Sequence, residues 1–92
     1  MPISEAEEIR AATLLEAAEE MAEKLGVRVL RDQMSTIGGL CRMKGEWRLY
    51  LNDELDSEGQ LIVCAQALAK FDLSDQYVLP ALRQEIERFK QE

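Results

Sequence analysis

The side chains that could carry chemistry in this chain are two cysteines, one lysine in an apolar stretch and a run of carboxylates. Cys41 and Cys64 could form a redox pair, or one of them could act as a nucleophile. A nucleophilic cysteine needs a nearby base, and the sequence contains no histidine to supply one. Because free cysteines usually behave as small hydrophobic residues, we expect both thiols to face the core.

The carboxylates lie within residues 53–58, at Asp53, Glu54, Asp56 and Glu58. This acid cluster could bind a hard cation such as Ca²⁺. Its spacing does not match an EF-hand loop, and acidic side chains also favour the first turn of a helix, where the helix dipole is positive. We therefore expect the acid cluster to stabilise a helix start rather than to hold a metal.

Lys70 lies in a segment that is otherwise apolar. Its ammonium group could extend past the end of the core, or it could line a groove. An enzyme or a small-ligand-binding protein that uses Cys41, Lys70 or the acid cluster is the alternative to a non-catalytic role.

Length and composition narrow the class of protein. The 92 residues form one domain, 1–92, with 11 basic and 18 acidic residues, a net charge of −7 and a hydrophobic fraction of 47%. This apolar content argues against disorder, and the negative charge argues against nucleic acid as a partner. There is neither a signal-peptide pattern nor an apolar run long enough for a membrane. We expect a cytoplasmic protein without a membrane partner.

A helix is predicted in the first third of the chain. Ser4 and Glu7 form a capping box at its start, and Gly26 follows its end. Its buried stripe comprises Leu14, Ala18, Met21 and Leu25. The opposite face carries Glu16, Glu19, Glu20 and Glu23, which we expect to be solvated rather than to form a docking surface.

Three short strands are predicted next, at residues 27–31, 40–43 and 47–51. Alternation places Trp47, Leu49 and Leu51 on one face of the last strand. A three-residue loop at 44–46 would set Cys41 opposite Leu49, so that the apolar residues all face inward. A two-residue loop would break this pattern and remains the alternative.

The outward face of these strands is predicted to hold Arg42, Lys44, Arg48 and Tyr50. In an acidic protein this would be a local basic patch with one aromatic side chain. It could meet an acidic partner, or the acidic helix of a second copy in a homodimer; the alternative is an ordinary solvated sheet face.

Two helices complete the predicted fold. The first begins with a capping box at Ser57 and Gln60 and is apolar nearly all round, so we expect it to be the central element. The second begins at Pro80 and buries Leu82, Ile86 and Phe89. The fold class is therefore α+β, with an N-terminal helix, a three-stranded mainly antiparallel sheet and two C-terminal helices that cover one side of the sheet.

Several segments resemble ImmA/IrrE-type zinc metallopeptidases. Residues 21–29 are similar to the family's entry into its first strand, and residues 49–52 to its strand that ends in asparagine. Residues 64–71, with the sequence CAQALAKF, are similar in register to the family's L-A-H-E-L-G-H-F helix, and residues 77–80 to its L-L-M-P segment. The resemblance implies a minimal zincin-like core.

The sequence differs from that family at the positions of the family's zinc ligands and catalytic base. The two histidine positions carry Gln66 and Lys70, and the position of the glutamate base carries Ala67. A zincin helix needs both imidazoles for Zn²⁺ and the carboxylate to activate water. We expect no catalytic residue, no metal and no cofactor. The expected function is a non-catalytic protein-interaction or accessory module that binds a protein, either a second copy or another chain.

Overall fold

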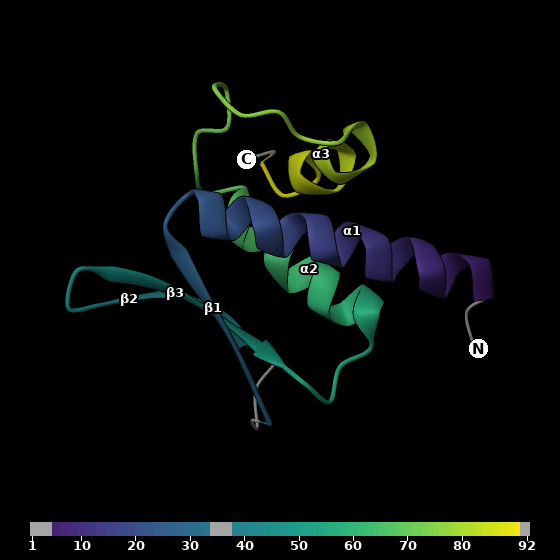
Figure 1. The fold of residues 1–92 in the computed structure, drawn as a ribbon, viewed down its shortest axis with the longest axis horizontal. Helices are drawn as coiled ribbons and strands as arrows, with labels where there is room; N and C mark the ends of the chain where they lie inside the picture. Colours follow the sequence, from purple (N-terminus) through teal and green to yellow (C-terminus); the bar gives the residue numbers. More distant parts are fainter. Residues whose placement is uncertain (1–4, 34–37, 91–92) are drawn as a thin grey trace.

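The computed structural model describes residues 5–33 and 38–90, and these form three helices and three strands (Figure 1). In chain order they are α1 (Glu5–Lys24), β1 (Val27–Asp32), β2 (Gly38–Met43), β3 (Glu46–Asn52), α2 (Ser57–Leu68) and α3 (Pro80–Glu87). The predicted α+β class is confirmed. The predicted cap at Ser4 lies outside the described residues.

β3 lies in the middle of the sheet, between β1 and β2. Its pairing with β2 is antiparallel, with Leu40 opposite Leu49, and its pairing with β1 is parallel, with Val29 beside Leu49. The sheet is thus mixed, whereas we expected a mainly antiparallel one. Alternation predicts which face a strand buries but not which strands are neighbours. β3, the central strand, carries the fully buried Leu49 and Leu51.

The helices all lie on one side of the sheet, as predicted (Figure 1). α2 is the central element and contacts α1, α3, β2 and β3. Its Leu61, Cys64 and Leu68 are buried to 1% exposure or less. This helix is apolar nearly all round because other elements pack against it on several sides.

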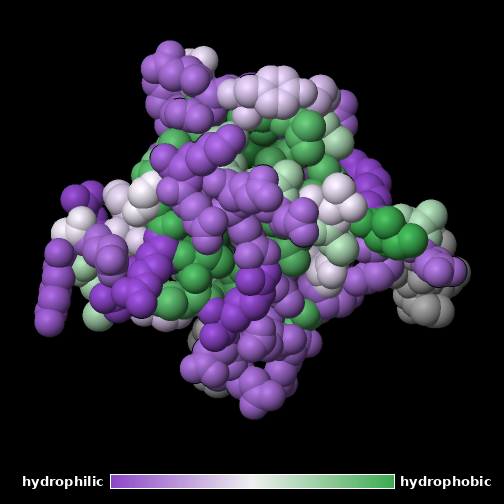
Figure 2. Space-filling model, viewed as in Figure 1, coloured by the Kyte–Doolittle hydropathy of each residue, from purple (hydrophilic) through white to green (hydrophobic). Residues whose placement is uncertain are grey.

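α1 packs its predicted stripe on α2, with Leu14, Ala18 and Met21 buried. It is followed by Gly26, whose φ of 85° lies in the region that glycine adopts most easily. α3 begins at Pro80 and buries Leu82 and Ile86, as predicted, whereas Phe89 follows the helix and is only partly buried. The acidic residues Glu16, Glu20 and Glu23 are exposed along α1, and Figure 2 shows hydrophilic side chains along this helix.

The turn between β2 and β3 contains two residues, Lys44 and Gly45, with φ values of 54° and 80°. Positive φ at both positions is typical of a type I′ turn, whose twist suits a hairpin. Met43 consequently pairs with Glu46, and the predicted three-residue loop is wrong.

This one-residue difference turns β2 over relative to the prediction. Cys41 pairs with Arg48 on the face away from the helices, so its expected inward position is wrong. Arg42 pairs with Trp47, so it lies on the helix side of the sheet rather than in the outward patch. The turn geometry therefore sets the register of β2 and β3. This register leaves Arg42 on the apolar side of the sheet, at the end of β2.

Candidate functional site

The three positions that the predicted resemblance matches to a zinc-peptidase helix lie in different surroundings. Gln66 is exposed on α2, Ala67 is 4% exposed and packs in the core, and Lys70 is exposed just after the helix. Gln66 and Lys70 line a shallow hollow together with Phe89 and Lys90. This hollow holds an amide and two ammonium groups, none of which can activate water beside a metal.

The two cysteines lie in different environments. Cys64 is fully buried, and burial raises the pKa of its thiol to about 12. Its expected place in the core is confirmed, and it is a thiol at neutral pH. Cys41 is partly exposed on β2, on the face away from the helices, and both cysteines are free. The structure therefore does not support a redox pair.

One member of the acid cluster, Asp56, caps α2. The side chain of Asp56 accepts a hydrogen bond from the backbone N–H of Gly59 at 2.8 Å, which makes Asp56 the N-cap. The predicted capping box at Ser57 is wrong, because the amide of Gln60 donates instead to the carbonyl of Leu55 at 2.9 Å. Within residues 5–33 and 38–90, no three His, Cys, Asp or Glu residues are grouped so that they could hold a metal.

The predicted basic patch is only partly assembled. Arg48 and Tyr50 both lie on the face of the sheet away from the helices, which we call the helix-free face. Nη1 of Arg48 donates to the Tyr50 hydroxyl at 3.4 Å, and Nε donates to Glu46 at 2.7 Å. Both hydrogen bonds raise the pKa of Arg48, and the bond to Tyr50 has the larger effect. Lys44 stands in the turn, and Arg42 belongs to the other face.

The helix-free face is a mixed apolar and charged surface. The register places on it Arg28, Leu30 and Asp32 of β1, Glu46, Arg48 and Tyr50 of β3, and Gly39, Cys41 and Met43 of β2. Met43 is 45% exposed, whereas Leu30, Cys41 and Tyr50 are partly buried. No described helix covers this face (Figure 1).

The end of the β2–β3 hairpin, residues 42–46, is ordered by its own side chains. The Arg42 guanidinium lies 5.0 Å from the centroid of the Trp47 ring, a cation–π distance. Met43 accepts a hydrogen bond at its sulfur from Arg48 at 3.7 Å. In Figure 1 this hairpin end projects away from the helices. We refer to residues 42–46 as the hairpin end.

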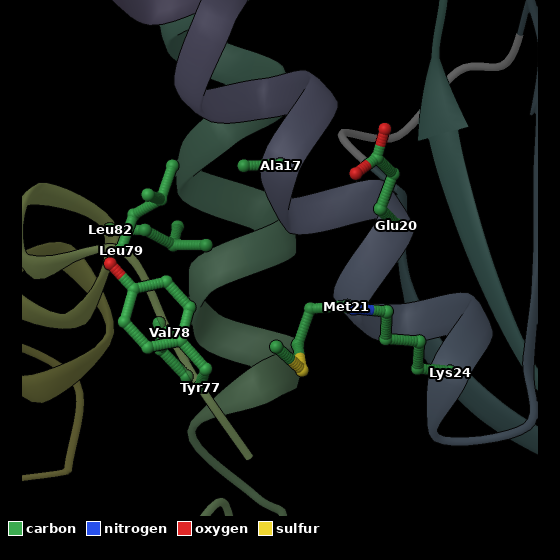
Figure 3. A pocket seen from close by; sticks show the side chains of 8 residues that line it. All are labelled: Ala17, Glu20, Met21, Lys24, Tyr77, Val78, Leu79 and Leu82. Carbon is green, nitrogen blue, oxygen red and sulfur yellow. The ribbon is translucent and has the colours of Figure 1, made fainter.

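A groove lies between α1 and the segment that leads into α3, with a volume of about 250 Å³. It is lined by Ala17, Glu20, Met21, Lys24, Tyr77, Val78, Leu79 and Leu82. Figure 3 shows Ala17 and Met21 on the α1 side and Tyr77 and Leu79 on the other. Tyr77 is 77% exposed and Leu79 is 40% exposed, so apolar side chains meet solvent here. We call this hollow the α1 groove.

Sequence reasoning missed the α1 groove. Its signal is the alternation at residues 77–79, where Val78 is buried and both neighbours are exposed. Sequence reasoning also missed Arg31, which lies on the helix side of β1. Arg31 forms an ion pair with Glu19 of α1 and donates to Gln60 of α2 at 3.3 Å.

Charge is divided between the sheet and the helices. Residues 27–52 contain five of the eleven basic residues but only two of the eighteen acidic ones, for a net charge of +3. The rest of the chain therefore carries −10. An acidic surface is attracted to the sheet, and a basic surface is attracted to the helices.

None of the helices in the described part of the chain has the length and apolar content needed to cross a bilayer. No family model, no curated protein and no solved structure matches the chain.

Proposed function

We propose that this chain is a non-catalytic protein-interaction module, built on a core that resembles a zinc metallopeptidase without its zinc site. The observation that carries the proposal is the helix-free face and the hairpin end beside it. This surface has an exposed Met43, a partly buried Tyr50 and a local excess of basic charge. Interfaces are enriched in tyrosine, methionine and arginine, which this surface combines.

The resemblance to ImmA/IrrE-type peptidases supports the non-catalytic half of the proposal. Gln66 and Lys70 meet at one hollow, but they bring no metal ligand of the kind that a zincin requires. Ala67, at the position of the base, is buried. A core of this kind retains a stable framework for surface contacts.

The alternative of a ligand-binding protein or enzyme finds less support. Asp56 begins α2 and Lys70 follows its end, so the helix separates them by about 18 Å at its usual rise. Cys41 lies on the helix-free face of β2. The three candidates therefore belong to three different parts of the molecule.

The test is capture from a lysate of the source organism with three immobilised proteins. Wild-type chain is compared with Lys44→Glu, at the exposed turn, and with Arg83→Glu, a matched charge reversal at an exposed position of α3. We expect wild type and Arg83→Glu to capture equal amounts of one protein, either a second copy or another chain. We expect Lys44→Glu to capture much less of it. Retention that is equal for all three, or that only Arg83→Glu reduces, would contradict the proposed surface.

A further inference from the structure

We propose that the partner is a second copy of this chain, whose hairpin end inserts Met43 into the α1 groove. This inference rests on the proposed interaction function and identifies the molecule that the hairpin end binds. The groove is part of the same chain, so each copy carries both halves of the contact.

The exposed apolar side chains support the match. Among the described residues, the exposed large hydrophobics are Ile9, Met43, Tyr77 and Leu79. Met43 stands beside a turn, whereas Tyr77 and Leu79 line the hollow of about 250 Å³ (Figure 3). A methionine side chain is unbranched and adapts to irregular apolar space. Docking would bury three of these four side chains at one contact.

The charges on the two surfaces are complementary. Met43 is flanked in the chain by Arg42 and Lys44, both exposed. The groove borders the exposed acidic face of α1, where Glu20 is a lining residue. Lys24 is the basic residue of the lining and opposes this attraction locally. The division of charge, +3 on the strand region and −10 elsewhere, favours the same orientation.

The hairpin does not fill the groove of its own chain in the described structure. Within the described residues, β2 and β3 contact α2 and each other, and β3 also contacts β1. Neither strand contacts α1 or α3, which border the groove. In this structure, a hairpin end that fills the groove therefore comes from another molecule.

The hairpin end is already in an ordered conformation. Lys44 and Gly45 form a tight turn, Arg42 lies on Trp47, and Arg48 donates to the sulfur of Met43. A segment that is ordered before binding loses less conformational entropy on binding. Two copies can insert their hairpins into each other and close as a pair, or they can join head to tail.

The test is sedimentation velocity of the purified protein between about 1 µM and about 100 µM, the range in which a small interface shows association. We expect association that Lys44→Glu and Glu20→Lys each weaken by roughly tenfold or more, because like charges then meet. Met43→Ala is expected to weaken it as well. Ile9→Ala is the matched control, because Ile9 is 60% exposed and does not line the groove.

A mixture of the two charge variants gives the sharpest result. The altered hairpin of Lys44→Glu then meets the altered groove of Glu20→Lys, and the second contact is wild type on both sides. We expect the equimolar mixture to associate more tightly than either variant alone. A monomer at every concentration, or a mixture no tighter than its components, would overturn the second-copy assignment.

The result also separates this inference from the function on which it rests. Suppose that the purified chain stays monomeric, and that wild type captures a different protein from the lysate which Lys44→Glu fails to capture. The proposed interaction function then holds, and the assignment of the partner as a second copy is wrong. If the chain is monomeric and Lys44→Glu loses nothing from the lysate, both proposals fail.

Discussion

The guanidinium of Arg42 lies over the indole of Trp47, and the same indole contacts the ring of Phe71. The first contact measures 5.0 Å to the ring centroid, and the two rings meet edge to face with centroids 5.5 Å apart. Phe71 follows α2 and packs on the core. A chain of three contacts thus connects the hairpin end to the core on the helix side of the sheet.

The central position of α2 predicts a large cost for its truncation. Leu68→Ala is expected to lower the free energy of unfolding by about 2–5 kcal/mol, because Leu68 is 1% exposed. The matched control is Gln66→Ala, at an exposed position on the same helix, with a change expected within about 0.5 kcal/mol. Urea denaturation followed by Trp47 fluorescence measures both. A loss below about 1 kcal/mol for Leu68→Ala would show that α2 is not central.

Gly38 lies against the backbone of β3, and its φ is 99°. A Cβ at this position would overlap the carbonyl oxygen of Tyr50, so Gly38→Ala is expected to cost about 3 kcal/mol or more. Gly39→Ala has open space at its Cβ and a φ of 150°, so its cost comes from backbone strain alone. Thermal denaturation compares the two variants. Equal costs would contradict the close approach at Gly38.

The buried thiol of Cys64 makes stability depend on alkaline pH. Its pKa rises from 9.0 to about 12 on folding, so the folded state keeps a proton that the unfolded chain releases. This group stabilises the fold below pH 9, and its contribution falls as pH rises toward 12. The free energy of unfolding, measured by urea denaturation, is expected to fall between about pH 8 and about pH 10.5. This fall is expected to be smaller for Cys64→Ala than for wild type. Equal losses would mean that the thiol ionises without hindrance in the fold.

Metal content tests the resemblance to an inactive peptidase core. Protein purified without chelators is expected to contain no stoichiometric zinc, since the proposed resemblance places Gln66 and Lys70 where that family has its histidine ligands. Elemental analysis measures this directly, with a zinc peptidase carried through the same purification as the positive control. About one zinc per chain would contradict the non-catalytic assignment.

The features that follow from hydrophobic spacing could be predicted from the sequence. The stripe of α1, the burial of Leu49 and Leu51, the central α2 and the start of α3 at Pro80 are confirmed. Each depends on a period of 3.6 or 2 residues, or on the missing N–H of proline.

The features that depend on turn geometry and on strand neighbours could not be predicted in this way. The type I′ turn places Arg42 on the helix side because its twist suits the hairpin, and this outweighs the alternation of apolar residues. The parallel pairing of β1 with β3 brings together residues about 20 positions apart, which local patterns do not specify. The α1 groove joins residues 17–24 to residues 77–82, and so it depends on the packing of distant segments.

The most direct test of the central claim is site-specific photo-crosslinking in living cells. The photoreactive residue benzoylphenylalanine replaces Tyr50 on the helix-free face in one protein, and Arg83 on exposed α3 in the other. We expect a discrete protein adduct from position 50 and none from position 83, with a mass that identifies either a second copy or another chain. No adduct at position 50, or the same adducts at both positions, would show that the helix-free face is not where this protein meets its partner.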